Sequence, residues 1–175
     1  YEDGKVKISN PDGTKIDAED VVRAGRLSYK SDFASHCTDV KGFTQQRGVI
    51  GGHNLTNFEN YITSNSIDIK RVSTNNGSFD GLTELSYQIK KADGSGNWKS
   101  NIFKKTLYDP AKVSDAEIIK WGKEAMEEGT VSNRIILQDN SSTIIKGVAA
   151  NGMKFIGYKD RVTNEILNFH PVNAW

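Results

Sequence analysis

The 175-residue sequence has little cysteine, little histidine and no long apolar run, and each shortage excludes a class of protein. Cys37 is the single cysteine, so an intrachain disulfide framework is excluded. No apolar run approaches the roughly 20 residues of a membrane-spanning helix, so we expect no stable membrane association. No signal peptide is recognisable, and the chain begins at Tyr1 without a methionine. We therefore expect a piece of a longer polypeptide.

Length and charge fit one domain with no obvious partner. The length suggests an N-terminal extension or linker over residues 1–25 and one domain over 26–175. The formal net charge is +1, which by itself indicates no partner. Acidic residues are in slight excess in residues 1–24, so the remainder has a mild basic bias. That bias suits a polyanionic ligand without proving one.

Three segments have the spacing of amphipathic helices. The first covers residues 18–29 and the second covers 55–66. The third, over 114–129, is the clearest, because Ser114 and Glu117 form a capping box at its start. We expect the first two to precede most of the sheet and the third to interrupt it.

Alternating apolar and polar residues, typical of antiparallel strands with one wet face, follow the second helix and resume after the third. The order predicts an α+β domain with N-terminal helices, then twisted antiparallel sheets with one further helix. The expected strand segments are 67–74, 83–91, 98–109, 134–139, 142–148, 154–160 and 165–172.

One of the three histidines has an unusual setting, in the stretch "RGVIGGHNL". His53 follows Gly51 and Gly52 and precedes Asn54, a good N-cap for the second helix. Glycines let a backbone approach a ligand, and the free N–H groups at a helix start attract an anion. An imidazole titrates near neutrality and suits acid–base work beside such an anion.

The other two histidines, His36 and His170, allow several chemistries. Cys37 beside His36 suggests a Cys–His pair, but neighbours on a strand point to opposite faces, so a small buried cysteine is the simpler interpretation. No serine-nucleophile elbow, phosphate-binding loop or metal-ligand histidine spacing is present in the sequence. Two histidines flanking a phosphodiester need no metal or cofactor: one takes the 2′-OH proton and the other protonates the leaving 5′ oxygen.

These residues resemble the EndoU endoribonucleases, which include eukaryotic, coronaviral and bacterial toxin members. The family has a first histidine and a second in a Gly-rich segment that opens a helix. Here His36 and His53 lie 17 positions apart, the second in "GVIGGHNL". The closing "LNFHPV" occupies the place of the family's Ser/Thr-x-Tyr-Pro element. The bacterial toxin branch is similar over about residues 26–172, including "GGHNLTNFENYI" and "FKKTLYDPAKVSDAEIIKWGKEAMEEG".

The resemblance implies roles for particular residues. His36 and His53 would share the general base and acid roles, in an order that the sequence leaves open. Lys70 is the best-placed third catalytic group by order along the chain, although Arg71 competes and Lys70 could equally be a solvated strand residue. A backbone N–H near Gly52 could instead stabilise the phosphorane.

The substrate contacts follow from the same resemblance. Thr83, in a loosely matching "GLTE" segment, is a candidate contact to a substrate hydroxyl. Asn168 stands where the family has Ser or Thr, and His170 where it has Tyr. His170 therefore puts a uracil preference in question, although an imidazole can still stack on a base. Manganese is reported for some eukaryotic members, but no carboxylate cluster in this sequence implies a metal.

The expected function is that of a bacterial toxin endoribonuclease of the contact-dependent inhibition type. It would cut RNA, with tRNA as the expected substrate, leaving 2′,3′-cyclic phosphate and 5′-OH ends. We expect a secreted or cell-surface toxin fragment that is delivered to the cytoplasm of a target bacterium. Such a toxin implies a cognate immunity protein. Two alternatives stay open: a non-catalytic binding or delivery module, and a metal-dependent DNase toxin using the same histidines.

Overall fold

The computed structural model describes residues 7–9, 15–17, 27–138 and 140–175. The helices of this part are α2 (Phe33–Thr38), α3 (Leu55–Ser64) and α4 (Asp115–Val131). The strands are β1 (Lys7–Ser9), β2 (Lys15–Asp17), β3 (Ser28–Tyr29), β4 (Val40–Thr44), β5 (Gly48–Gly51), β6 (Ile69–Asn76), β7 (Leu82–Ile89), β8 (Phe103–Tyr108), β9 (Ile135–Leu137), β10 (Ser142–Val148), β11 (Lys154–Asp160) and β12 (Glu165–Val172). This is the α+β architecture that the sequence predicts.

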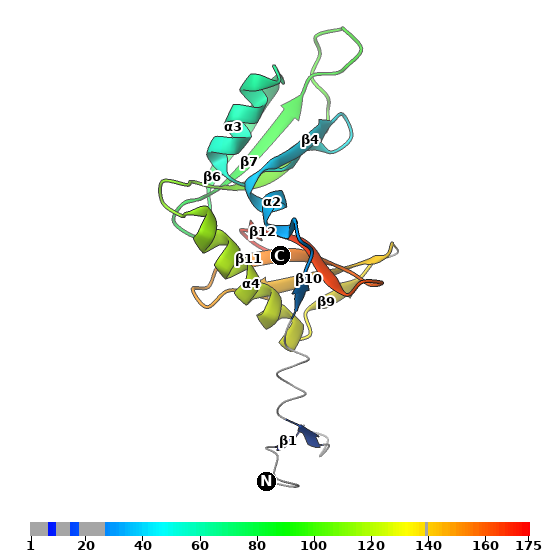
Figure 1. Ribbon diagram of the computed structural model, residues 1–175. Helices are drawn as coiled ribbons and strands as arrows, with labels where there is room; N and C mark the ends of the chain where they lie inside the picture. Colours follow the sequence, from blue (N-terminus) through cyan, green and yellow to red (C-terminus); the bar gives the residue numbers. More distant parts are fainter. Residues whose placement is uncertain (1–6, 10–14, 18–26, 139) are drawn as a thin grey trace.

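The larger half is a five-stranded sheet with α4 on one face (Figure 1). Its strand order is β3-β12-β11-β10-β9, antiparallel except for β3 beside β12. Every second residue of β10 is buried, as the alternating pattern predicts. The helix approaches closely because glycines meet its neighbours: Gly122 faces the Phe169 ring, and Gly147 faces the backbone of Ala125.

The smaller half is a three-stranded antiparallel sheet, β6-β7-β8, with the β4–β5 hairpin and α3 packed against it (Figure 1). Its core is a separate cluster of six buried residues: Val49, Phe58, Leu85, Tyr87, Ile89 and Leu107. Helix α3 begins at its N-cap Asn54, whose side chain accepts from the N–H of Asn57 at 3.1 Å. Asn54 therefore starts α3 as the sequence indicates.

Two sequence predictions need correction. The helix expected over 18–29 lies mostly outside the described residues, and its last two positions form β3 instead, paired in parallel with β12. His36 and Cys37 lie on the short helix α2, not on a strand. Cys37 is fully buried, as the simpler interpretation expects. The capping box at Ser114 is present as predicted.

We predict that Gly147→Ala destabilises the larger half. A Cβ at Gly147 would lie 1.7 Å from the Ala125 carbonyl oxygen, which is backbone of α4 and cannot move without shifting the helix. We expect a loss of about 3 kcal/mol in the free energy of unfolding, measured in urea. Gly94→Ala is the control, since its Cβ meets nothing within 4 Å and the change costs about 1 kcal/mol of backbone strain at φ +74°. Equal losses in the two variants would contradict the close approach.

Candidate active site

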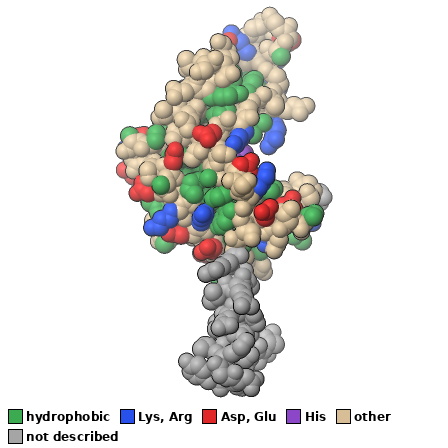
Figure 2. Space-filling view, in the orientation of Figure 1, with side chains coloured by type: hydrophobic (Ala, Val, Ile, Leu, Met, Phe, Trp, Pro, Cys, Tyr) green, Lys and Arg blue, Asp and Glu red, His purple; other side chains and the backbone are tan. Residues whose placement is uncertain are grey.

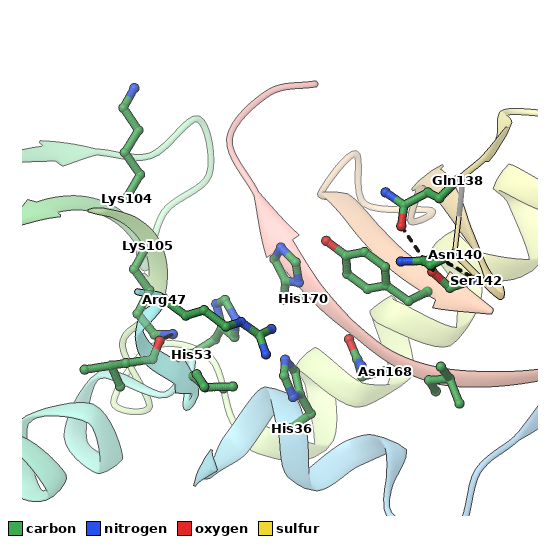
Figure 3. A pocket seen from close by; sticks show the side chains of 15 residues that line it. His36, Arg47, His53, Lys104, Lys105, Gln138, Asn140, Ser142, Asn168 and His170 are labelled. Carbon is green, nitrogen blue, oxygen red and sulfur yellow. Dashed lines mark hydrogen bonds between the residues drawn. The ribbon is translucent and has the colours of Figure 1, made fainter. Parts of the chain in front are cut away.

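A cleft of about 640 Å³ lies between the two halves (Figure 3). The smaller half contributes residues of β5 and β8, and the larger half contributes β11, β12 and the β9–β10 turn. Helix α2 contributes His36. The lining residues are His36, Arg47, Val49, Ile50, Gly51, His53, Lys104, Lys105, Gln138, Asn140, Ser142, Tyr158, Leu167, Asn168 and His170.

All three histidines of the chain meet in this cleft. The rings of His36 and His53 are 6.4 Å apart between centroids and tilted by 41°. The ring of His170 stacks on that of His53, at 4.6 Å and 8°. Tyr158 is nearly parallel to His170, at 6.2 Å and 25°. Residues far apart in the sequence therefore form one aromatic cluster.

His53 is fixed by its backbone. Its N–H donates to the Cys37 carbonyl at 2.7 Å, and its C=O accepts from the N–H of Tyr108 at 2.8 Å. Its two preceding glycines both have positive φ, which a residue with a Cβ rarely adopts. A Cβ at Gly52 would also lie 2.3 Å from Val40 Cγ2. The two glycines thus let the chain pass close to the end of α2 and the start of β4 before α3 begins.

The ring of His53 has a defined tautomer. Its Nδ1 lies 2.7 Å from the carbonyl oxygen of Thr106, and His53 is only 7% exposed. A carbonyl oxygen can only accept, so Nδ1 carries the hydrogen in this bond. In the neutral ring Nε2 therefore has a free lone pair, the form that a general base needs.

The helix start beside His53 is tied to the other half of the molecule. Asn54 donates from Nδ2 to Asp115 Oδ1 at 2.8 Å, and the hydroxyl of Tyr108 donates to the same oxygen at 2.5 Å. Asp115 is the first residue of α4, so one carboxylate connects the starts of α3 and α4. This contact fixes the two halves on either side of the cleft.

Lys105 is the buried cation of the site. It is 7% exposed, and its Nζ donates to the Val49 carbonyl at 3.2 Å. Burial lowers its pKa to about 8. Our sequence reasoning missed this residue, although a signal existed: Lys105 is in phase with Phe103 and Leu107, on the apolar face of its strand.

Burial also keeps the three imidazoles neutral. The pKa of His36 falls to about 4, through burial first and then the charge of Lys105. The pKa of His170 falls to about 3, through burial, His36 and Lys105. Burial and Lys105 hold the pKa of His53 well below its usual range. Figure 2 shows very little histidine surface on the visible face, with Lys or Arg side chains beside it.

Of the predicted site residues, His36, His53, Asn168 and His170 line the cleft. Gly52 adjoins it, but its N–H already donates to the His36 carbonyl at 3.0 Å and is not available to a phosphorane.

Two further predicted residues are not brought to the cleft. Lys70 lies on β6, the strand of its sheet farthest from β8, which lines the cleft, and its side chain is exposed. Thr83, at the start of β7, lines a different hollow with Asp80 and Lys112.

The described residues lack two further kinds of feature. No group of three or more His, Cys, Asp or Glu side chains in this part of the chain is arranged to hold a metal ion. None of the helices described is long and apolar enough to cross a membrane.

Comparison with known proteins identifies the family. The model of the bacterial EndoU nucleases matches residues 31–173, which hold the three histidines and Lys105. A tRNA nuclease CdiA of Yersinia mollaretii is 31% identical over 172 residues, covering 96% of this chain and 5% of that protein. A tRNA nuclease CdiA of Escherichia coli is 29% identical over 152 residues, covering 83% of this chain and 4% of that protein. This chain thus spans about one twentieth of the length of these relatives. The chain belongs to the bacterial EndoU nuclease family, which confirms its resemblance to the EndoU endoribonucleases.

Proposed function

We propose that this domain cuts RNA by metal-independent transesterification at the cleft between its two halves. The observation that carries the proposal is the meeting of His36, His53 and buried Lys105 in one cleft. With ring centroids 6.4 Å apart and the rings tilted by 41°, the two imidazoles are close enough for their nitrogens to contact one phosphate group from two sides. That is the arrangement that in-line attack requires, with a base on one side and an acid on the other.

The tautomer of His53 supports an assignment of roles. The lone pair on Nε2 of His53 takes the proton of the ribose 2′-OH as the bond from O2′ to phosphorus forms. His36, protonated in the complex with RNA, gives its proton to the 5′ oxygen as the bond from phosphorus to O5′ breaks. The products are a 2′,3′-cyclic phosphate and a 5′-OH. A phosphate between the rings raises the pKa of His36 from its value of about 4, because an adjacent negative charge favours the imidazolium.

Lys105, in place of Lys70, supplies the positive charge that the phosphorane needs. Its ammonium group is buried in the cleft, where a charge interacts more strongly than at the exposed surface of β6. Asn168 and His170 of β12 line the cleft, where His170 stacks on His53, and both are proposed to contact the nucleotide.

The names of the relatives support tRNA as the substrate. We propose that the domain is the nuclease portion of a secreted or cell-surface toxin of the contact-dependent inhibition type, and that it acts in the cytoplasm of a target bacterium. A producing cell would then need an immunity protein that covers the cleft. No cofactor is part of the proposal.

The first prediction concerns the three proposed catalytic groups. The purified chain should cut bacterial tRNA in the presence of EDTA and leave cyclic phosphate ends. His36→Ala and His53→Ala should each lower the rate at least about 100-fold, the size of a lost acid or base. Lys105→Ala should lower it by about 100-fold through lost charge stabilisation. Rates and end groups are measured on labelled tRNA.

Lys70→Ala is the matched control, because it removes a lysine of the same domain from an exposed strand and should leave the rate unchanged. Circular dichroism and thermal unfolding establish that each variant is folded. Equal losses in Lys70→Ala and Lys105→Ala would refute the role of Lys105. Cleavage of DNA, or of RNA only after a metal is added, would instead favour the metal-dependent nuclease. A parent chain that cuts no nucleic acid would favour the remaining alternative, a non-catalytic binding module.

A second prediction concerns pH. Because the pKa of Lys105 is lowered to about 8, its ammonium is present below that pH and lost above it. Loss of the His36 proton already lowers kcat/KM with rising pH, and we expect that decline to become steeper above about 8, where Lys105 loses its charge. In Lys105→Arg the guanidinium stays charged, so this alkaline decline should move upward even if the rate is lower throughout. A decline at the same pH in Lys105→Arg would show that another group titrates; Lys70→Arg serves as the unaltered reference.

A further inference from the structure

The wall of the cleft opposite the catalytic groups is the β9–β10 turn, by which we mean Gln138, Asn140 and Ser142. The N–H of Ser142 donates to Asn140 Oδ1 at 2.9 Å. The Ser142 hydroxyl lies 2.5 Å from the same oxygen and 3.1 Å from Gln138 Oε1. The guanidinium of Arg161 donates to the backbone carbonyls of Gln138 and Asn140. The turn is thus held from both ends.

These bonds orient the two amide groups. An amide oxygen accepts and an amide nitrogen donates, so the N–H of Ser142 determines which end of Asn140 faces it. The oxygens of both amides are occupied by Ser142, and their nitrogens have no hydrogen-bond acceptor among the described protein residues. Figure 3 shows both nitrogens pointing toward the middle of the cleft. The turn therefore offers the cleft pre-oriented, uncharged donors.

The position of the turn suits a base better than a phosphate. In Figure 3 the turn faces Arg47 and Lys105 across the cleft, with His170 and Asn168 between. The cationic side is the natural place for phosphate, since charged donors bind it more strongly than amides do. Asn and Gln amides instead read the edges of bases. A cleft of about 640 Å³ also has room beyond one phosphate and its ribose.

We propose that Gln138 and Asn140 form a second nucleotide subsite, which binds the base of a nucleotide adjoining the cleaved bond through that base's acceptor atoms. The subsite rests on the proposed RNA-cleaving function. Guanine offers two neighbouring acceptors, O6 and N7, and cytosine and uracil offer carbonyl oxygens. Adenine offers its ring nitrogen N7 as an acceptor but has no carbonyl oxygen beside it, so its exocyclic amino group would face one of the two donors. Adenine is therefore the base that the subsite disfavours.

The test is cleavage of a random-sequence RNA pool, with both sides of each cut read by sequencing. The parent chain should disfavour adenine at one flanking position by about tenfold, the effect of one or two neutral hydrogen bonds. Asn140→Asp keeps the oxygen that accepts from Ser142 and replaces the donor by an acceptor. Gln138→Met removes the other donor at similar size without adding charge. Each variant should lose most of this discrimination.

Asn151→Asp is the matched control. Asn151 Oδ1 accepts from the N–H of Met153 at 3.0 Å in the β10–β11 turn, a similar local bond outside the residues that line the cleft. It adds the same charge and should keep the parent's preference. If Asn140→Asp fails to fold, Gln138→Met leaves the bond between Asn140 and Ser142 in place and decides the question alone.

Two results would overturn the subsite alone: a parent chain that cuts RNA with no preference at either flanking position, and variants that cut all sequences more slowly with the preference unchanged. The second result would mean that the turn contributes general affinity and reads no base. A parent that cuts no RNA would overturn the proposed function, and the subsite with it.

Discussion

The site depends most on the hydrogen bond between His53 Nδ1 and the Thr106 carbonyl. This bond sets both the plane of the ring and the nitrogen that faces the cleft. It forms only because the backbone of His53 is held on two sides, by Cys37 of α2 and by Tyr108 at the end of β8. Every polar group of His53 other than Nε2 is therefore engaged by the fold, and the remaining atom is the one that chemistry requires.

The other features of the cleft follow from burying so many basic groups together. Three imidazoles share this cleft with the cations Arg47, Lys104 and Lys105, and none of the described residues that line it carries a carboxylate. Burial and mutual repulsion make protonation of the imidazoles unfavourable, so their pKa values fall. An anion relieves this repulsion. In the proposed mechanism, the free protein thus holds the neutral ring that accepts the first proton, and a bound phosphate favours the imidazolium that donates the second.

Much of this arrangement could be predicted from the sequence. The glycines before His53, the N-cap Asn54 and the capping box at Ser114 are local signals, and local hydrogen bonds determine those elements. The helix that carries His36 could not be predicted, because its six residues are too few to show a clear helical period. That His36 and His53 meet in one cleft was expected from the family resemblance, since spacing alone does not determine a contact between α2 and β5.

Lysine was harder to assign, and the reason is physical. Lys70 and Lys105 both occupy strands of one three-stranded sheet. Two positions away, Lys105 has Phe103 and Leu107, whereas Lys70 has Asp68 and Val72. Which of them is buried depends on the face that the sheet turns toward the β4–β5 hairpin, and on whether the strand adjoins the cleft. Both depend on contacts between residues that are far apart in the sequence. The apolar phase of Lys105, between Phe103 and Leu107, was the only local indication.

The two halves of the molecule contribute different residues to the cleft. The smaller half supplies His53 and Lys105, and the hydrogen bonds that set their geometry lie within it or involve α2. The larger half supplies Asn168, His170 and the amide-bearing turn, which are surface features of a sheet with its own core. A substitution in that turn alters no hydrogen bond of His53. The carboxylate of Asp115 connects the two halves, so the proposed nucleotide-binding residues of the larger half are held beside His53 without forming any of its hydrogen bonds.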